Sequence, residues 1–278
     1  MNRQDPNYRR AVFHAGVGVL FLLAGIDFAS PSLQAQENPD AVESAPVLLL
    51  REGAMESPPA PRTIWRLNAL NPTFVLYHDG LVIFKKEYRQ SELFSAQLRP
   101  DEMRALLQGF NLEEFLRLEE SYRTNNHVDQ PGSVIKYWQD QTMKRVMVSG
   151  PIRDSQEDRN KAPQAFLAIF DRLCAFHHEN ARLWEPKTVQ LHVFPYQEAK
   201  GESVAWPTAW PDLNDPTTKD TTATYGRESY DIFLNGDQRD ELEQLLSGLK
   251  EKQTVLMNGR QWYVSPHRYL LPNEELFD

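Results

Sequence analysis

The sequence predicts an α+β fold in which antiparallel sheets, built from β-hairpins, carry amphipathic helices packed on one face. Two dipeptides, Asp79-Gly80 and Asn258-Gly259, each separate runs rich in β-branched and aromatic residues, which is the strongest short-range signal of a hairpin. Apolar side chains also recur at helical spacing, most clearly from Phe166 to Leu173. Both halves of the chain run from strands to an amphipathic helix and then to a closing hairpin, an order that fits two related α+β units.

The first 36 residues have the three parts of a secretory signal peptide. Arginines at positions 3, 9 and 10 precede an apolar run, Ala11–Ile26, and small residues follow up to the expected cleavage site near Ala35 or Gln36. The apolar run holds 16 residues, whereas a membrane-spanning helix needs roughly 20. We therefore expect a cleaved signal and a secreted or periplasmic protein with no membrane attachment after cleavage. An uncleaved N-terminal anchor is the alternative.

The composition excludes some classes of binding partner and an intramolecular disulfide. The 278 residues are 41 % hydrophobic and 25 % charged, as in an ordinary globular protein. The net charge of −9 argues against nucleic acid and anionic membranes as partners, because both require a basic patch. Cys174 is the only cysteine, so the fold contains no intramolecular disulfide. We expect this thiol to be a small buried hydrophobe, with a nucleophile or an intermolecular disulfide as the alternative.

A flexible leader is expected at residues 37–45, and an N-terminal α+β unit at residues 46–184. The break at Glu185-Pro186 marks the end of that unit. Its predicted elements are a strand at 47–51, a proline-rich loop at 57–61, a hairpin at 73–85, a helix that opens at Pro100, a short helix capped by Asn111, a second hairpin at 134–148 that turns near Asp140-Gln141, and a helix from about Pro163 to Arg182.

The hairpin around Asp79-Gly80 is apolar on both faces. One face of its first strand carries Phe74 and Leu76, and the other carries Val75 and Tyr77. We therefore expect it to lie in a sheet that is covered on both sides. Its turn is expected to be of type I′, with positive φ at both central residues.

A C-terminal α+β unit is expected at residues 187–278. Its predicted elements are a strand at 189–194, a long loop with two Trp-Pro steps, a strand at 230–234, a helix capped by Asp237 that reaches Leu249, and the hairpin around Asn258-Gly259.

Two motifs of the chain are Leu76-Tyr77-His78-Asp79-Gly80-Leu81-Val82-Ile83 and Arg268-Tyr269-Leu270-Leu271-Pro272-Asn273-Glu274. With them the chain resembles a group of uncharacterised secreted bacterial proteins, which have a tyrosine–aspartate–glycine hairpin and close on an arginine, paired leucines, a proline and an acid. The resemblance extends in order to the tryptophan–proline loop. It departs at Glu52-Gly53-Ala54-Met55, where the group is richer in glycine and has an aromatic residue. It implies export and this architecture, and carries no assigned activity.

Motifs of familiar catalytic sites are absent from the sequence. It contains no Gly-x-Ser-x-Gly, no phosphate-binding glycine loop, no His-Glu-x-x-His and no Cys-x-x-Cys. We expect no catalytic residue, no metal and no cofactor. Neighbouring helix positions point about 100° apart, so His177 and His178 are expected at a solvated helix end instead of on one metal ion. A pair between His192 and either Asp231 or Glu228 is the hydrolytic alternative.

The loop with two Trp-Pro steps is the clearest candidate for binding. Its indole rings would stack on a sugar or anchor a protein partner, or else they fold back as a lid over the sheet. The candidate binding residues are Trp206, Trp210, Trp262, Tyr263, His267 and Arg268.

Two classes of function follow. The first is a non-catalytic binding or inhibitory module of the cell envelope, whose partner is a protein, a peptide or a glycan. The alternative is an envelope or extracellular hydrolase with a His/carboxylate site. An enzyme needs a concave site with converging polar groups, whereas a binding module needs exposed aromatic residues with a polar rim. The missing catalytic motifs favour the binding module.

Overall fold

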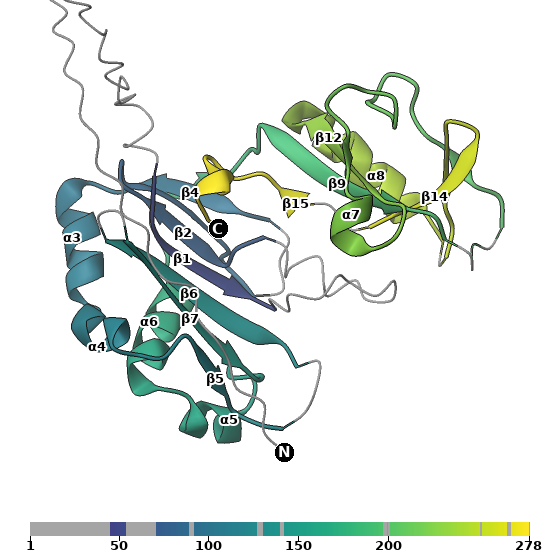
Figure 1. The fold of residues 1–278 in the computed structure, drawn as a ribbon. Helices are drawn as coiled ribbons and strands as arrows, with labels where there is room; N and C mark the ends of the chain where they lie inside the picture. Colours follow the sequence, from purple (N-terminus) through teal and green to yellow (C-terminus); the bar gives the residue numbers. More distant parts are fainter. Residues whose placement is uncertain are drawn as a thin grey trace, which may run out of the picture. The chain divides into compact units, whose positions relative to one another are not determined.

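Six α-helices and fifteen β-strands in two sheets make the described part of the chain an α+β protein, as predicted (Figure 1). The computed structural model describes residues 45–53, 71–88, 92–126, 130–139, 142–196, 199, 201–250, 252–265 and 268–277. The predicted signal peptide, most of the leader, the proline-rich loop, the turn at Asp140-Gln141 and His267 lie outside these residues. Both sheets belong to the same compact unit of the chain.

The first sheet has eight strands in the order β5-β7-β6-β1-β2-β3-β4-β8. All neighbours are antiparallel except β5 and β7. The strands are β1 (Pro46–Glu52), β2 (Phe74–Tyr77), β3 (Leu81–Phe84), β4 (Phe94–Gln97), β5 (Ser121–Arg123), β6 (Gly132–Gln139), β7 (Thr142–Ser149) and β8 (Arg182–Leu183).

The two faces of the first sheet pack into different cores, as the hairpin pattern predicted. Phe74 and Leu76 of β2 lie in a core on the helix side, which we call the helix-side core. Val75 and Tyr77 lie in a core shared with the second sheet, which we call the inter-sheet core. All four side chains are fully buried. A sheet covered on both faces needs apolar residues at successive positions, because side chains alternate along a strand.

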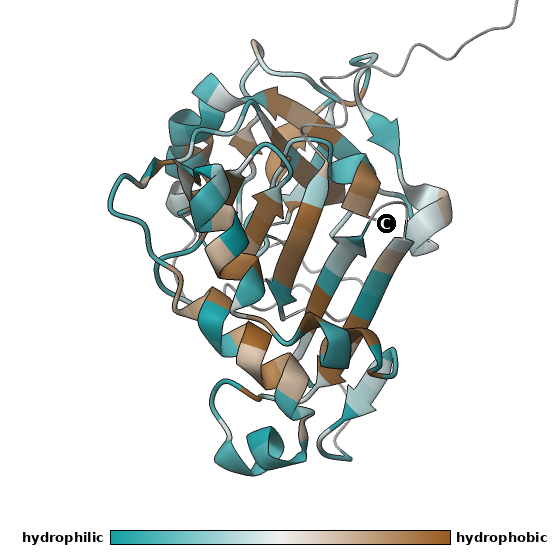
Figure 2. Ribbon diagram, turned by 90° about the vertical axis from the view of Figure 1, so that its left-hand side faces the viewer, coloured by the Kyte–Doolittle hydropathy of each residue, from teal (hydrophilic) through white to brown (hydrophobic). Residues whose placement is uncertain are grey.

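Three helices place apolar side chains on the helix-side face (Figure 1). They are α3 (Pro100–Gln108), α4 (Leu112–Leu116) and α6 (Gln164–Cys174). The polar helix α5 (Gln156–Lys161) is joined to Thr124 and Asn125, just after β5, through hydrogen bonds that Asp158 accepts. Figure 2 looks onto these helices, which are banded in hydrophilic and hydrophobic residues, with hydrophobic strands behind them. The apolar stripe of α6, including Phe166 and Ile169, is fully buried in the helix-side core. Asn111 caps α4 as predicted, since its side chain accepts a hydrogen bond from the Glu114 amide.

Two predicted helix boundaries are wrong. The helix expected to reach Arg182 ends at Cys174, because Phe176 turns into the core and packs edge-on against Phe84 at 4.9 Å. In the second half, Asp237 does not cap the helix. A 3-10 turn, Gly236–Gln238, comes first, and α8 spans Arg239–Gly248.

The turn at Asp79-Gly80 also differs from the predicted type I′. Of these two residues only Gly80 has positive φ, +85°. The Gly80 amide donates to the Tyr77 carbonyl, and the Asp79 carboxylate accepts from the Leu81 amide. This is a longer hairpin loop that ends in a left-handed glycine. The turn at Asn258-Gly259 does have positive φ at both residues, 50° and 74°, as a type I′ turn requires.

The second sheet is formed by β9 (Thr188–Phe194), β10 (Val204–Ala205), β11 (Lys219–Asp220), β12 (Tyr230–Asn235), β13 (Val255–Met257), β14 (Arg260–Val264) and β15 (Arg268–Tyr269). Its order is β10-β13-β14-β9-β12-β11, and β15 pairs with β9. Val189, Leu191 and Val193 of β9 point into the inter-sheet core, where Leu242 of α8 also lies. The short helix α7 (Thr222–Tyr225) follows β11.

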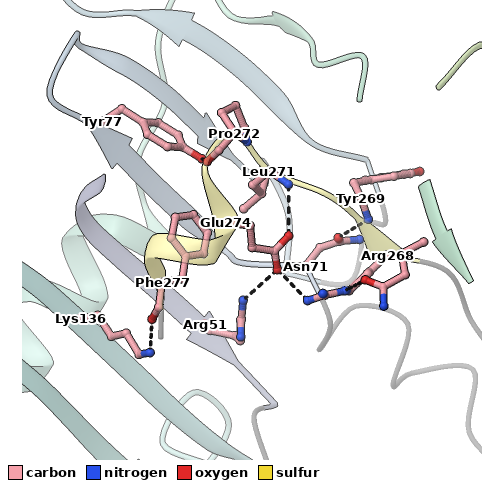
Figure 3. Close-up of polar contacts among 11 residues, drawn as sticks. Arg51, Asn71, Tyr77, Lys136, Arg268, Tyr269, Leu271, Pro272, Glu274 and Phe277 are labelled. Atoms are coloured by element: carbon pink, nitrogen blue, oxygen red, sulfur yellow. Dashed lines mark hydrogen bonds and ion pairs between the residues drawn. The ribbon is translucent and has the colours of Figure 1, made fainter. Parts of the chain in front are cut away.

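Residues Arg268–Phe277 return from the second sheet to the first, and we call them the C-terminal strap (Figure 3). The Tyr269 amide donates to Oδ1 of Asn71 over 2.9 Å, in a buried position. The hydroxyl of Tyr77 donates to the carbonyl of Pro272 over 3.1 Å. The strap thus ties the end of the second sheet to β2 and to the residues just before it.

A 3-10 helix, Glu274–Phe277, completes the strap. The Phe277 ring is buried against Tyr77 and Trp138, with centroid distances of 6.4 and 6.2 Å. Its carbonyl accepts a hydrogen bond from Lys136 (Figure 3). The strap therefore covers the face of the first sheet opposite to the helices.

Among the described residues, none of the helices combines the length and the apolar character that crossing a membrane requires.

Candidate ligand-binding face

The side of the second sheet that points away from the inter-sheet core carries polar and aromatic side chains. We call it the outer face. Along β9 it receives Gln190, His192 and Phe194, which alternate with the two valines and one leucine that point into the core. Strand pairing then fixes the neighbours on the same face: β12 places Asp231 opposite His192, and β14 places Tyr263 opposite Phe194.

Five rings on this face contact one another in a row, which we call the ring ladder: Tyr196, Tyr263, Phe194, His192 and Tyr225. Successive centroids are 5.2, 5.2, 5.7 and 4.5 Å apart. The planes are tilted by 41–61°, which is a geometry that aromatic pairs prefer over face-to-face stacking. The three tyrosines are half-buried, so they are fixed in place and still reach solvent.

Two tyrosines of the ladder are held in the neutral form. Burial raises the pKa of Tyr225, and the nearby Asp231 carboxylate adds to the effect. Burial likewise raises the pKa of Tyr263, with a contribution from Tyr196. Both hydroxyls therefore remain hydrogen-bond donors and acceptors well above neutral pH.

A chain of hydrogen bonds fixes the polar part of the outer face. Nδ1 of His192 lies 2.9 Å from Oδ1 of Asp231, and Gln190 donates to Oδ2 of the same carboxylate over 2.6 Å. Arg268 donates to the Gln190 side chain and to Glu274 of the strap over 2.5 and 2.6 Å. The Asp231 carboxylate only accepts, so Nδ1 of His192 carries its proton.

Two cations lie over rings of the outer face. The Arg227 guanidinium is 4.0 Å from the centre of the Phe194 ring, and the Lys219 ammonium is 5.2 Å from the centre of the Phe233 ring. Both side chains belong to exposed residues. A cation over an aromatic face is attracted by the negative charge of the ring and is held in a defined position.

The His192–Asp231 pair has the geometry of the orienting half of a catalytic triad, but its surroundings do not complete one. Among the described residues the His192 ring contacts Asp231, Phe194 and Tyr225, and it receives no hydrogen bond from a serine, threonine or cysteine. Nucleophilic catalysis requires such a group within hydrogen-bond reach of the histidine. The face is chemically suited to holding a ligand by stacking, hydrogen bonds and charge.

The predicted binding residues divide into three groups. Tyr263 and Arg268 do lie on the outer face, while His267 lies outside the described residues. The indoles of Trp206, Trp210 and Trp262 are buried in the inter-sheet core, with exposed fractions of 6 %, 7 % and 0 %.

The tryptophan–proline loop has the lid arrangement. Trp206 and Trp210 pack edge to face at 5.2 Å, and the Trp206 indole donates to the Pro211 carbonyl. Neither indole face is open to a ligand in this structure.

A second polar cluster lies at the edge of the helix-side core. Glu52 is buried and accepts two hydrogen bonds from Arg153, over 2.8 and 2.7 Å, and one from Thr73 over 2.8 Å. Cys174 lies 2.6 Å from Arg153. Burial raises the pKa of this thiol well above its usual range, and Glu52 adds to the shift. A thiol held protonated is a poor nucleophile, which agrees with a structural role.

The hollow beside this cluster is too small for a substrate. It has a volume of about 20 Å³, and its lining includes Glu52, Tyr88 and Arg153. Such a space accommodates about one water molecule, whereas small-molecule sites are typically more than tenfold larger.

Because α6 ends at Cys174, the two adjacent histidines lie beyond the helix and not at its last turn as predicted. His177 and His178 follow the end of α6, and His178 lies 3.9 Å from Glu102 of α3. In the described part of the chain, no group of three or more histidine, cysteine, aspartate or glutamate side chains is arranged to hold a metal ion.

Sequence reasoning missed Phe194, Tyr196, Tyr225 and Arg227, which come from two separate segments, 194–196 and 225–227. One signal was available: the alternation along 188–194 leaves Gln190, His192 and Phe194 on a single face.

Comparison with protein-family models, curated proteins and solved structures finds no match for this chain.

Proposed function

We propose that the chain is a non-catalytic binding or inhibitory module of the cell envelope, and that its protein, peptide or glycan ligand docks on the outer face of the second sheet. The observation that supports this proposal is the ring ladder, with its three half-buried tyrosines. Arg227 lies over Phe194 of the ladder, and Lys219 lies over Phe233 on the same face. A binding face needs rings that are held rigidly, reach solvent and have polar groups around them.

Export is part of the proposal and is supported by the signal-like first 36 residues. Expression of the full chain in a bacterium should give a secreted or periplasmic product that begins at or next to Gln36. Mass spectrometry of the purified product identifies its first residue. A product that keeps residues 1–35 and stays with the membrane fraction contradicts this part of the proposal.

The binding role is tested by capturing envelope proteins and glycans on immobilised protein. The double variant Tyr225→Ala/Tyr263→Ala removes two rings of the ladder and should lose most of the capture, because the anchoring rings of an interface carry most of its binding energy. Tyr122→Ala, a half-buried tyrosine of β5 in the first sheet, is the matched control and should capture as much as the wild type. Equal capture by all three proteins, each shown to be folded by circular dichroism, rules out the outer face.

A hydrolase is the second candidate, and the 2.9 Å contact between His192 and Asp231 is the observation that favours it. Wild-type protein, His192→Gln and Asp231→Asn should be compared for hydrolysis of ester, peptide and glycan substrates. A non-catalytic module predicts no turnover by any of them. Turnover by the wild type that both substitutions abolish would replace the binding proposal with the enzyme.

A further inference from the structure

Two exposed cations lie on the outer face of this acidic protein. The chain carries a net charge of −9, yet Arg227 lies over Phe194 and Lys219 over Phe233 on this face. Arg268, the third cation of the face, donates to Glu274. The Asp231 carboxylate is largely buried and accepts from His192 and Gln190. An exposed guanidinium beside the ladder attracts an anionic ligand.

The carboxylate nearest to Arg227 in sequence is already neutralised. Glu228 accepts hydrogen bonds from two guanidinium nitrogens of Arg260, over 2.7 and 2.9 Å, in a bidentate ion pair. Among the described residues no carboxylate accepts a hydrogen bond from Arg227, and its contact is the Phe194 ring. A guanidinium that lies over a ring keeps its N–H donors at its edge, where they suit a carboxylate that arrives along the face.

The topology excludes one mode of peptide binding, the addition of a strand beside β9. β9, which carries the centre of the ladder, pairs with β12 on one side and with β14 and β15 on the other. Its backbone donors and acceptors are therefore used within the sheet, and a peptide strand cannot be added beside it. A ligand on this face must bind through side chains, and tyrosine rings with neutral hydroxyls suit the apolar faces and hydroxyls of sugars.

From these observations we infer that the ligand is an anionic glycan, whose sugar rings stack on Tyr263 and Tyr225 while a carboxylate on the sugar pairs with Arg227. This inference rests on the proposed function, since it names the chemical class of the ligand for the same face. It predicts that both charge and ring shape are needed for binding.

The test is a calorimetric titration of the full chain with three probes: oligomers of polygalacturonate, the same oligomers as neutral methyl esters, and poly-L-glutamate. Polygalacturonate should bind, and each of the other two should bind at least about tenfold more weakly, because one loses the charge and the other loses the sugar ring. Arg227→Gln and Tyr263→Ala should each weaken polygalacturonate binding by about tenfold. Arg104→Gln, which removes an exposed arginine of α3, is the control and should bind as the wild type does.

Each other outcome overturns the inference. No binding of polygalacturonate, equal binding of its methyl ester, or equal binding of poly-L-glutamate contradicts an anionic glycan as the ligand. If the neutral ester or the peptide binds equally and Tyr263→Ala weakens that binding, the outer face remains the binding site and only the ligand class is wrong. If no probe responds to Tyr263→Ala or Arg227→Gln, and envelope capture does not respond either, the proposed function fails as well.

Arg227→Lys keeps the charge without the planar guanidinium. Its affinity for polygalacturonate should lie between those of Arg227→Gln and the wild type, which separates loss of contact from loss of folding.

Discussion

Lys85, which follows β3, is 4 % exposed, although lysine is rarely buried to this extent. Burial lowers its pKa to about 8, and the Glu52 carboxylate opposes that shift. In the unfolded chain the same ammonium keeps its proton to about pH 10.4. Folding therefore carries a cost below pH 8, because a charged group is taken out of water.

The pH dependence of stability follows from the sign of that shift. Between pH 8 and 10 the unfolded state binds more protons at Lys85 than the folded state does, so this residue makes stability rise with pH. Relative to Lys85→Met, which has no such proton, the unfolding free energy of the wild type should rise by about 3 kcal/mol across this window. Urea unfolding at four pH values measures the difference, and a difference that stays flat contradicts the assignment.

At the scale of elements, the buried ring of Phe277 holds the end of the C-terminal strap against the first sheet. Phe277 is 3 % exposed and packs against Tyr77 and Trp138, while its neighbour Leu276 is 45 % exposed. Phe277→Ala removes a buried ring and should lower the unfolding free energy by about 3 kcal/mol or more. Leu276→Ala, in the same 3-10 turn, should change it by less than about 0.5 kcal/mol. Denaturant unfolding checks both, and similar losses for the two variants would mean that the strap is not packed as described.

Elements with strong local signals were predictable from the sequence. Local residues specify the hairpins around Asp79-Gly80 and Asn258-Gly259, the cap at Asn111 and the amphipathic stripe of α6, and all of these form. Errors arose where distant residues decide the outcome, as when Phe176 leaves the helical path to fill the space beside Phe84. Helix α5 was missed because Gln156–Lys161 is polar throughout. It is held by the Ser155 cap and by contacts from Asp158 to Thr124 and Asn125.

The candidate site was predictable only in part, for the same reason. Tyr263 and Arg268 were identified because they lie near an obvious hairpin. Tyr225 and Arg227 reach the same face through the pairing of β11, β12 and β9, which no local pattern specifies. The sequence of the loop with Trp206 and Trp210 is compatible both with a ligand-binding surface and with a lid over the sheet. The loop is a lid because an apolar surface lies beneath it, and the loop's own sequence does not specify that surface.

At the scale of the whole molecule, the inter-sheet core makes the two sheets depend on each other. Leu49 of β1 and Val75 of β2 share this core with Leu191 of β9 and Trp262 of β14. An interface that is large and apolar couples the stability of the parts it joins, whereas a small polar one leaves them independent.

We expect both sheets to unfold in one transition. Tryptophan fluorescence, which reports mainly on the inter-sheet core, and far-UV circular dichroism should give the same urea midpoint. Leu49→Ala should shift both midpoints together, with a loss of about 3 kcal/mol, whereas Leu183→Ala at an exposed position should leave them in place. Two separated transitions in the wild type contradict a shared core.

The position of the C-terminal strap in the sequence has a consequence for the time course of folding. The hydroxyl of Tyr77 donates to the carbonyl of Pro272, which is synthesised 195 residues later. Until then one apolar face of the first sheet lacks its cover, and contacts between residues so far apart form slowly because the chain must first close a long loop. A nascent chain with this order of elements exposes the apolar face of an incompletely folded sheet, and such surfaces aggregate or bind chaperones. Yield in cells should therefore be limited by how soon residues 268–277 dock, more than by the stability of the finished fold.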